Sequence, residues 1–355
     1  MASTFHIDSG AAEFVAPAQV LPFRAHHLSN GEMLMSHSYA LYIWPLSGEQ
    51  EPRLAVRYNG SGALRRQVEA LPLVERFLRG GVHLARRTKS GSIVAFIKGT
   101  VLHAAQGDGE LSAVFRIPGG ARPLNVVETP EGMLFFGQYG NNPARQEISL
   151  FASTDGGAHW DAAYTFSPGT VRHIHGVLYD PYRHGLLVLT GDLDGECGVY
   201  LTTDGFRNLE PLLRGTQKAR AVSVIPIPQG WVIPGDTPLE RNYITLLEVD
   251  GTLRPLAEIP GSSFSTCRTR NGLFVSTGVE PSTINREPYA TIWASKDGLS
   301  WKCVHRAMKD RYAGRFFQYA NLLFADGLEE SDRLYATGVS LRGLHHRTLA
   351  WDALP

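Results

Sequence analysis

The sequence repeats about every 47 residues, and this repeat restricts the possible folds more than any other feature. Five Asp-Gly pairs begin at Asp108, Asp155, Asp204, Asp250 and Asp297, so successive pairs are 47, 49, 46 and 47 residues apart. Two more pairs, at Asp194 and Asp326, lie outside this register. Such a period indicates that one supersecondary unit recurs along most of the chain.

Each of the five pairs follows an alternating or apolar run that is typical of a β-strand. The runs are Val101–Ala105, Ile148–Ser153, Val199–Thr203, Ile244–Val249 and Thr291–Ser295. In a tight turn, an aspartate accepts hydrogen bonds from backbone amides and glycine adopts a positive φ. The Asp-Gly pairs therefore mark turns at the ends of strands.

A second marker, a glycine or polar residue followed by an apolar run, precedes these turns. It occurs seven times, beginning at Gly31, Gly91, Gly132, Gly185, Gly230, Gly272 and Arg333. Two markers in a constant order indicate units of about four strands, the composition of a propeller blade. We predict an all-β fold in which residues 1–355 form a single β-propeller with seven four-stranded antiparallel blades; six blades are the alternative.

The two ends of the chain predict how the ring closes. The seventh unit ends after its third strand, near residues 346–351, and a strand-like stretch, Glu13–Val20, lies near the start. We expect this stretch to complete the last blade, because closure removes exposed sheet edges. Two insertions interrupt the repeat: residues 63–79 have the apolar spacing of an amphipathic helix, and residues 307–317 form a basic, aromatic loop.

Composition excludes several classes of function. Lys plus Arg and Asp plus Glu number 34 each, so no overall field favours nucleic acid or an anionic membrane. No run approaches the roughly 18 apolar residues of a membrane span. The three cysteines, Cys197, Cys267 and Cys303, lack the spacing of a disulfide framework or a thiolate zinc site. With no signal-peptide pattern at the start, these features predict a cytoplasmic protein.

The repeat also predicts where polar side chains gather. If each blade runs outward from an inner first strand, the starts of first strands and the ends of second strands meet on one face near the axis. In the fourth blade, this rule places His173 and His175 near Asp192. Equivalent positions in neighbouring blades add Tyr139, Asp236 and Glu280, and these six residues are the candidate catalytic groups.

Arginine and amide side chains surround the same predicted opening. The candidate substrate-binding residues are Arg24, Arg122, Asn142, Arg145, Arg220, Asn242, Arg315 and Gln318. Guanidinium groups bind carboxylate, sulfate or phosphate through paired hydrogen bonds, and amides suit sugar hydroxyls. A carboxyl crowded by others has a raised pKa suited to acid or base catalysis. We therefore predict an acidic oligo- or polysaccharide as the partner.

A metal site is a second interpretation of the fourth blade. Two histidines separated by one residue on a strand point to the same side, and Asp192 supplies a third ligand for a divalent ion such as Ca²⁺, Mn²⁺ or Zn²⁺. The competing interpretation is that His173 and His175 are hydrogen-bonded to loop carbonyls. The residues alone leave both open.

Two turns carry a fuller pattern: residues 153–160 are STDGGAHW and residues 295–301 are SKDGLSW. Both resemble the Asp-box, or BNR, repeat of sialidase-like and sortilin-type propellers. Sialidases have six blades; in them three arginines bind an acidic sugar, a tyrosine assisted by a glutamate is the nucleophile, and an aspartate is the acid/base. The resemblance implies similar roles here. Some seven-bladed polysaccharide lyases also use His, Tyr and Arg. We expect an enzyme that cleaves or modifies an acidic glycan; the alternative is a non-catalytic glycan- or protein-binding propeller.

Overall fold

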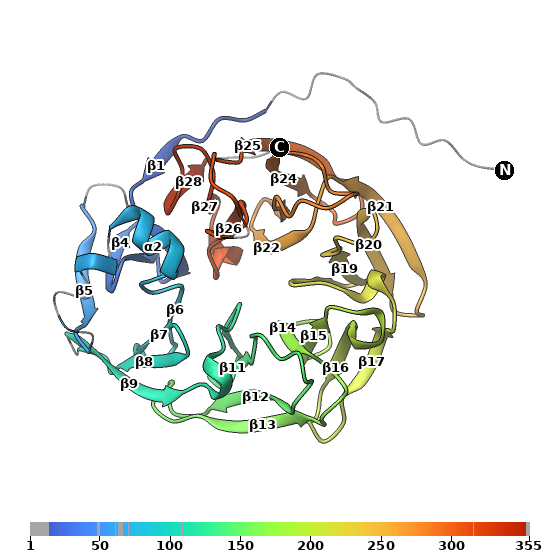
Figure 1. The fold of residues 1–355 in the computed structure, drawn as a ribbon, viewed down its shortest axis with the longest axis horizontal. Helices are drawn as coiled ribbons and strands as arrows, with labels where there is room; N and C mark the ends of the chain where they lie inside the picture. Colours follow the sequence, from blue (N-terminus) through green and yellow to red (C-terminus); the bar gives the residue numbers. More distant parts are fainter. Residues whose placement is uncertain are drawn as a thin grey trace.

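In the computed structural model, the described residues form seven four-stranded antiparallel sheets around a central axis, and two of these sheets are joined edge to edge (Figure 1). The structure describes residues 14–47, 50–60, 62, 67–69, 71–107, 109–314 and 316–352. Each sheet is one blade, and its first strand lies nearest the axis. We call the face on which the first strands begin the top face.

The first three blades contain the following strands. Blade one consists of β2 (Arg24–Ser29), β3 (Glu32–His37), β4 (Ala40–Pro45) and β5 (Arg53–Tyr58). Blade two consists of β6 (Leu84–Arg87), β7 (Ile93–Ile97), β8 (Thr100–Ala104) and β9 (Glu110–Arg116). Blade three consists of β10 (Val127–Glu128), β11 (Leu134–Gly137), β12 (Ile148–Ser153) and β13 (Asp161–Phe166).

The remaining blades follow the same order. Blade four consists of β14 (His173–Asp180), β15 (Gly185–Gly191), β16 (Gly198–Thr202) and β17 (Glu210–Arg214). Blade five consists of β18 (Ile225–Ile227), β19 (Gly230–Pro234), β20 (Asn242–Glu248) and β21 (Leu253–Ile259). Blade six consists of β22 (Ser263–Thr269), β23 (Gly272–Thr277), β24 (Tyr289–Ser295) and β25 (Lys302–Met308).

An N-terminal strand completes the seventh blade, as predicted, but it spans Gln19–Leu21 rather than Glu13–Val20, and Glu13 lies outside the described residues. That blade contains β26 (Asn321–Phe324), β27 (Leu334–Val339), β28 (Arg347–Trp351) and, at its outer edge, β1 (Gln19–Leu21). β1 pairs antiparallel with β28, with Gln19 opposite Ala350 (Figure 1). Blades one and two are also joined at their outer edges, where β5 and β9 form a short parallel pairing.

The second strands are the most deeply buried elements, because each packs against the neighbouring blades on both faces. All seven residues of β15 and all five of β19 are buried. Continuous apolar runs suit strands that are covered on both sides. Each of the seven predicted markers begins or immediately precedes a second strand, so the predicted blade count is confirmed.

The Asp-Gly turns connect third and fourth strands. Asp155 accepts hydrogen bonds from the amides of Ala158 and His159, both at 3.0 Å, and the Trp160 indole donates to the Gly157 carbonyl at 2.9 Å. The turn at Asp297 has the same arrangement. Asp108 lies outside the described residues. These turns are held by local hydrogen bonds, which is why the sequence signals them so clearly.

The first strands contain a feature that the repeat does not signal, a β-bulge near the top face. In β14, Ile174 pairs with Thr190 and Gly176 with Leu189, so His175 is the extra residue. The same irregularity occurs around His26 in β2 and Phe264 in β22. A bulge redirects one side chain and locally bends its strand. It directs the His175 ring toward the end of β15.

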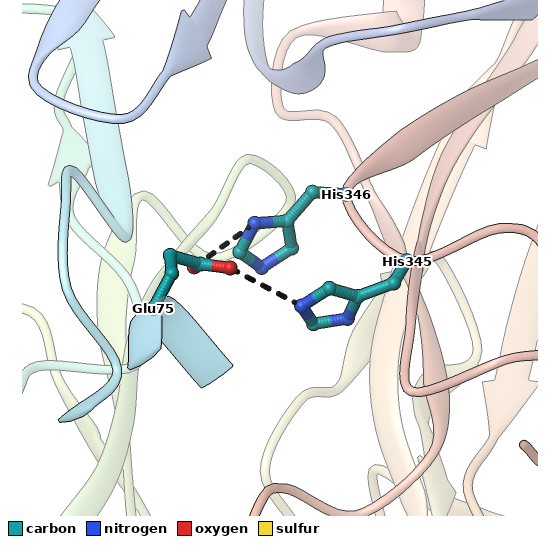
Figure 2. Close-up of side chains that lie close together, drawn as sticks. All are labelled: Glu75, His345 and His346. Atoms are coloured by element: carbon teal, nitrogen blue, oxygen red, sulfur yellow. Dashed lines mark hydrogen bonds and ion pairs between the residues drawn. The ribbon is translucent and has the colours of Figure 1, made fainter. Parts of the chain in front are cut away.

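The insertion after blade one contains a shorter helix than residues 63–79 would form. Residues 67–69 are helical, and α2 spans Pro72–Leu78, while residues 63–66 and 70 lie outside the described residues. α2 is fastened to the loop between blades six and seven: the buried Arg76 pairs with Asp310 at 2.5 Å. Glu75 faces His345 and His346 in the loop between β27 and β28 (Figure 2). Among the described residues, no helix is long and apolar enough to cross a membrane.

Candidate functional site

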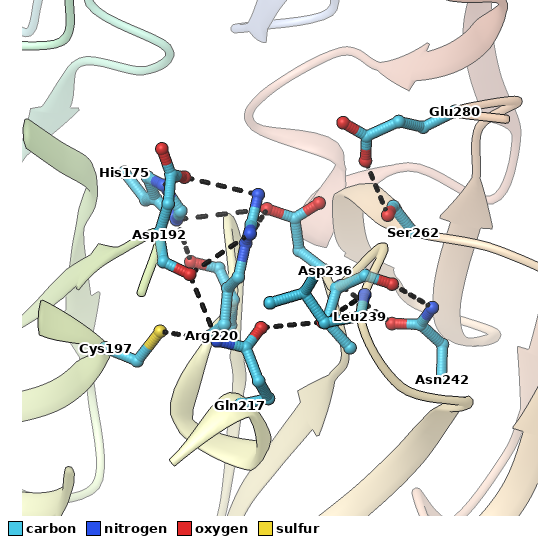
Figure 3. A network of polar contacts seen from close by, with 12 residues as sticks. His175, Asp192, Cys197, Gln217, Arg220, Asp236, Leu239, Asn242, Ser262 and Glu280 are labelled. Carbon is cyan, nitrogen blue, oxygen red and sulfur yellow. Dashed lines mark hydrogen bonds and ion pairs between the residues drawn. The ribbon is translucent and has the colours of Figure 1, made fainter. Parts of the chain in front are cut away.

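Polar side chains from blades four to six lie close together near the ends of the second strands (Figure 3). β14 supplies His173 and His175, and the loop after β15 supplies Asp192. The connection before β18 supplies Arg220, and the loop after β19 supplies Asp236. Second strands end, and first strands begin, on the same face of each antiparallel blade, so residues far apart in sequence meet here.

His173, His175 and Asp192 form a compact triangle. Nε2 of His173 lies 3.1 Å from Nε2 of His175 and 3.2 Å from Oδ1 of Asp192. Nε2 of His175 lies 3.4 Å from the same carboxylate oxygen. Both imidazoles are buried, whereas the Asp192 side chain is 20% exposed, so the triangle opens on the Asp192 side.

Arg220 links two carboxylates in this site (Figure 3). Its Nη2 lies 3.2 Å from Oδ1 of Asp192, and its Nε lies 3.6 Å from Oδ2 of Asp236. Burial raises the pKa of Asp236 to about 8 despite the Arg220 charge. Burial also opposes ionisation of Asp192, but the two imidazoles and Arg220 hold the pKa of this carboxyl well below its usual range.

Tyr139 and Glu280 border the same site without joining the triangle. The Tyr139 ring lies 4.4 Å from the His173 ring, and burial raises the pKa of this tyrosine to about 12, with a contribution from Asp236. The Ser262 hydroxyl donates to Oε2 of Glu280 at 2.9 Å. Sequence reasoning missed Arg172, whose guanidinium lies 3.3 Å from Oδ2 of Asp192 and which directly precedes β14.

The predicted amide residues have structural partners. Asn242 is buried and exchanges hydrogen bonds with the backbone of Thr237, and Asn142 does the same with Gln146 in an exposed loop. Arg145 pairs with Glu196 at 2.7 Å. Gln318 lies half-buried in the loop after β25, and Arg315 lies outside the described residues. Asn242, Asn142 and Arg145 therefore have hydrogen-bond partners within the protein, and Asn142 and Arg145 line one surface pocket.

A cationic group occupies the part of the top face next to α2. Arg24 begins β2, Arg122 precedes β10, and both are partly buried. Nη2 of Arg122 donates to the Arg79 carbonyl at 2.6 Å. Within the described residues, neither guanidinium forms an ion pair with a carboxylate. Burial lowers the pKa of both arginines to about 10, so both are charged at neutral pH.

An exposed apolar surface borders these arginines, and sequence reasoning missed it. Leu73 and Phe77 are one helical turn apart on α2 and are 53% and 59% exposed. The Phe77 ring lies 6.3 Å from that of Phe317 in the loop after β25. We call Leu73, Phe77 and the half-buried Phe317 the α2 patch. Phe77 belongs to the apolar spacing that predicted an amphipathic helix, but the buried contact of this helix with the rest of the protein is made by Arg76.

Comparisons with known proteins identify the fold. No protein-family model and no curated protein matches the chain. Solved structures do match. The WD40 β-propeller domain of Doa1 is 8% identical, with a TM-score of 0.57, and the alignment covers 96% of this chain and 95% of that one. A structure of YCF48 bound to D1 peptide is 12% identical, with a TM-score of 0.58 and coverages of 98% and 100%.

A chain of a Mitotic Checkpoint Complex structure is 11% identical, with a TM-score of 0.59 and coverages of 100% and 99%. The expectation of a glycan-cleaving enzyme is wrong, because the matched structures are WD40 and YCF48 propellers. These matches also give no support to an acidic polysaccharide partner or to a sialidase-like relationship. At these identities the likeness concerns the fold, and the chain is a seven-bladed β-propeller.

Proposed function

We propose that this protein is a non-catalytic interaction propeller that binds an acidic, partly apolar peptide segment of a protein partner on its top face. The observation that carries the proposal is the α2 patch. Exposed aromatic and aliphatic side chains grouped on one surface are typical of protein interaction sites. Here they come from the two insertions that interrupt the blade repeat, after β5 and after β25.

Charge specifies the chemistry of the segment. Arg24 and Arg122 keep their charge. Glu75 is close enough to raise the pKa of Arg24, but within the described residues neither guanidinium forms an ion pair with a carboxylate, so both favour an anionic group from outside. A carboxylate fits this role, because guanidinium groups bind it through paired hydrogen bonds. Arg122 contacts the Arg79 carbonyl at the C-terminal end of α2, so one segment of a few residues is long enough to reach the arginines and the α2 patch.

The related folds are consistent with this proposal. One matched structure is YCF48 bound to D1 peptide, and another comes from a protein assembly, the Mitotic Checkpoint Complex. The catalytic roles predicted for Asp192, Asp236 and Glu280 are not needed for binding at the α2 patch.

The test uses a random peptide library displayed on phage and selected on the immobilised protein. We expect selected peptides to combine acidic and apolar residues. Their affinity, measured by fluorescence polarisation, should fall at least about tenfold, or about 1.4 kcal/mol, in Phe77→Ser and in Arg122→Gln. Higher salt should weaken binding to the wild type, because the carboxylate contact is screened.

Matched controls come from the outer strand of blade one. Leu54 and Arg53 lie on β5, far from the axis, and Leu54 is 50% exposed. Leu54→Ser and Arg53→Gln should therefore leave affinity unchanged. The proposal fails if no peptide is selected, or if selected peptides bind equally well to Phe77→Ser, Arg122→Gln and the wild type. Binding of an acidic glycan that Phe77→Ser does not weaken would favour a glycan-binding propeller instead.

A further inference from the structure

We infer that His173, His175 and Asp192 form a binding site for one divalent transition-metal ion of the Zn²⁺ class. This inference goes beyond the proposed function, because it concerns other residues and needs no partner. Two imidazoles and one carboxylate form a common ligand set for such ions. The three ligand atoms are 3.1, 3.2 and 3.4 Å apart.

The triangle has the right size for an ion. Zinc binds imidazole nitrogen and carboxylate oxygen at about 2.0–2.2 Å. At a bond length of about 2.1 Å, ligand atoms are about 3.0 Å apart at neighbouring octahedral positions and about 3.4 Å apart at tetrahedral positions. The observed separations lie at or between these values to within about 0.1 Å. The ligand set therefore needs no rearrangement to hold an ion.

Hydrogen bonds on the outer side of each ring fix where the protons lie. Nδ1 of His173 is 3.1 Å from the Gly140 carbonyl, and Nδ1 of His175 is 3.0 Å from the Ala221 carbonyl. A carbonyl oxygen only accepts hydrogen bonds, so each Nδ1 carries the hydrogen. In a neutral imidazole, Nε2 then presents a lone pair. Two lone pairs and a carboxylate oxygen therefore face one another, and a cation stabilises that arrangement.

The same outer contacts are those expected around a metal-binding histidine, whose second nitrogen usually donates to a carbonyl or carboxylate. Arg220 orients the carboxylate of Asp192, because its Nη1 donates to the Asp192 carbonyl and its Nη2 lies beside Oδ1. Asp192 is the most exposed of the three ligands, so the ion's remaining positions face the axis, where water completes the coordination.

A second cluster of possible metal ligands consists of Glu75, His345 and His346 (Figure 2), and its His345 has the opposite proton arrangement. Nδ1 of His345 accepts a hydrogen bond from the Ser340 amide at 3.1 Å. In the neutral ring, Nε2 must then carry the proton, and it points at Oε2 of Glu75 at 3.4 Å. His345 is therefore a hydrogen-bond donor that fastens α2, and it serves as the matched control.

Gly191 gives a second way to test the site. This residue ends β15 directly opposite His173, and a Cβ atom at position 191 would lie 2.5 Å from Cε1 and 3.0 Å from Nε2 of His175. Gly191→Ala must therefore displace the imidazole while every ligand remains in the sequence. We expect Gly191→Ala to stay folded and to lose metal affinity.

The experiment uses untagged, full-length protein treated with EDTA and dialysed. Zn²⁺ is added and counted by mass spectrometry, and Co²⁺ binding is followed by its visible absorption. We expect one ion per chain in the wild type and in His345→Gln. Affinity should be at least about tenfold weaker in His175→Gln, His173→Gln and Gly191→Ala, with folding checked by circular dichroism.

The inference is overturned if the wild type binds neither ion, or if folded His175→Gln binds as tightly as the wild type. In the first case, hydrogen bonds among His173, His175 and Asp192, without an ion, would account for their arrangement. Because this assay contains no peptide, and because peptide binding is tested with Phe77 and Arg122 variants, failure of one proposal is distinguishable from failure of the other.

Discussion

One aspartate holds the outer turn between β12 and β13. Asp155 accepts hydrogen bonds from the amides of Ala158 and His159 and from the Ser153 hydroxyl. Hydrogen bonds from the amide and the ring of His159 and from the Ser153 hydroxyl outweigh the opposing effect of burial and hold the pKa of the Asp155 carboxyl well below its usual range. Ionised Asp155 therefore stabilises the fold above the unfolded-state pKa of roughly 3.9, and this contribution is lost as pH falls toward the lower folded-state pKa.

We expect Asp155→Asn to lower the free energy of unfolding by about 1 kcal/mol at pH 7, the usual effect of removing a side chain that caps backbone amides. The difference from the wild type should shrink at pH 3, because protonation already destabilises the wild type there. Urea unfolding at both pH values measures this difference in the free energy of unfolding. Asp161→Asn, on β13 beyond the turn, is the control, and an equal Asp155→Asn effect at both pH values would contradict the explanation.

At the scale of elements, one buried ion pair fastens α2 to the loop between blades six and seven. Arg76 lies 2.5 Å from Asp310 and donates to the Ser340 hydroxyl at 3.1 Å, and its guanidinium lies 4.5 Å from the centre of the Tyr312 ring. Removing one member of a buried ion pair leaves an uncompensated charge and costs about 3–5 kcal/mol. Because α2 is an insertion, that loss should release the helix rather than unfold the ring.

Arg76→Ala should therefore increase cleavage by protease within residues 71–79 and weaken the peptide binding proposed for the α2 patch. Limited proteolysis with mass spectrometry measures the first effect and fluorescence polarisation the second. Arg79→Ala is the control, because the exposed Arg79 side chain follows the helix while its carbonyl remains available to Arg122. Unchanged proteolysis in Arg76→Ala would show that other contacts hold α2.

The elements that could be predicted from sequence are those specified by local signals. Gly132 and the apolar run after it mark β11, and Asp155 with Gly156 marks a turn, because backbone geometry and nearby hydrogen bonds decide both. The bulge at His175 could not be predicted, since it depends on how β14 pairs with β15.

Long-range packing limited the prediction of the site in the same way. His173, His175 and Asp192 were expected to lie together because strand order places them on one face, and their outer hydrogen bonds appear only in three dimensions. Asn242 was assigned to ligand binding, but it turns inward to bond Thr237. The α2 patch was missed because apolar spacing predicts which helix face is apolar but does not predict whether another element covers it.

At the scale of the whole molecule, the ring depends on one short strand that joins the two ends of the chain. β1 pairs with β28 over residues 19–21, and Leu21 packs into the cluster that contains Leu349 and Trp351. Alternation along the strand leaves Val20 43% exposed and Leu21 only 7% exposed. Without this pairing, the edge of β28 would be open, and open edges promote association between chains.

Leu21→Asp should therefore separate β1 from blade seven, because a carboxylate is costly to bury without a partner. We expect the free energy of unfolding to fall by about 3 kcal/mol or more, together with the appearance of aggregates. Val20→Asp, one residue earlier on the exposed side of the same strand, should behave like the wild type. Urea unfolding and size-exclusion chromatography compare the two variants. If Leu21→Asp remains as stable and monodisperse as Val20→Asp, blade seven does not need β1. Closure of the ring must then come from contacts between blades one and seven, such as the hydrogen bond that the Leu28 amide donates to the Asp326 carbonyl.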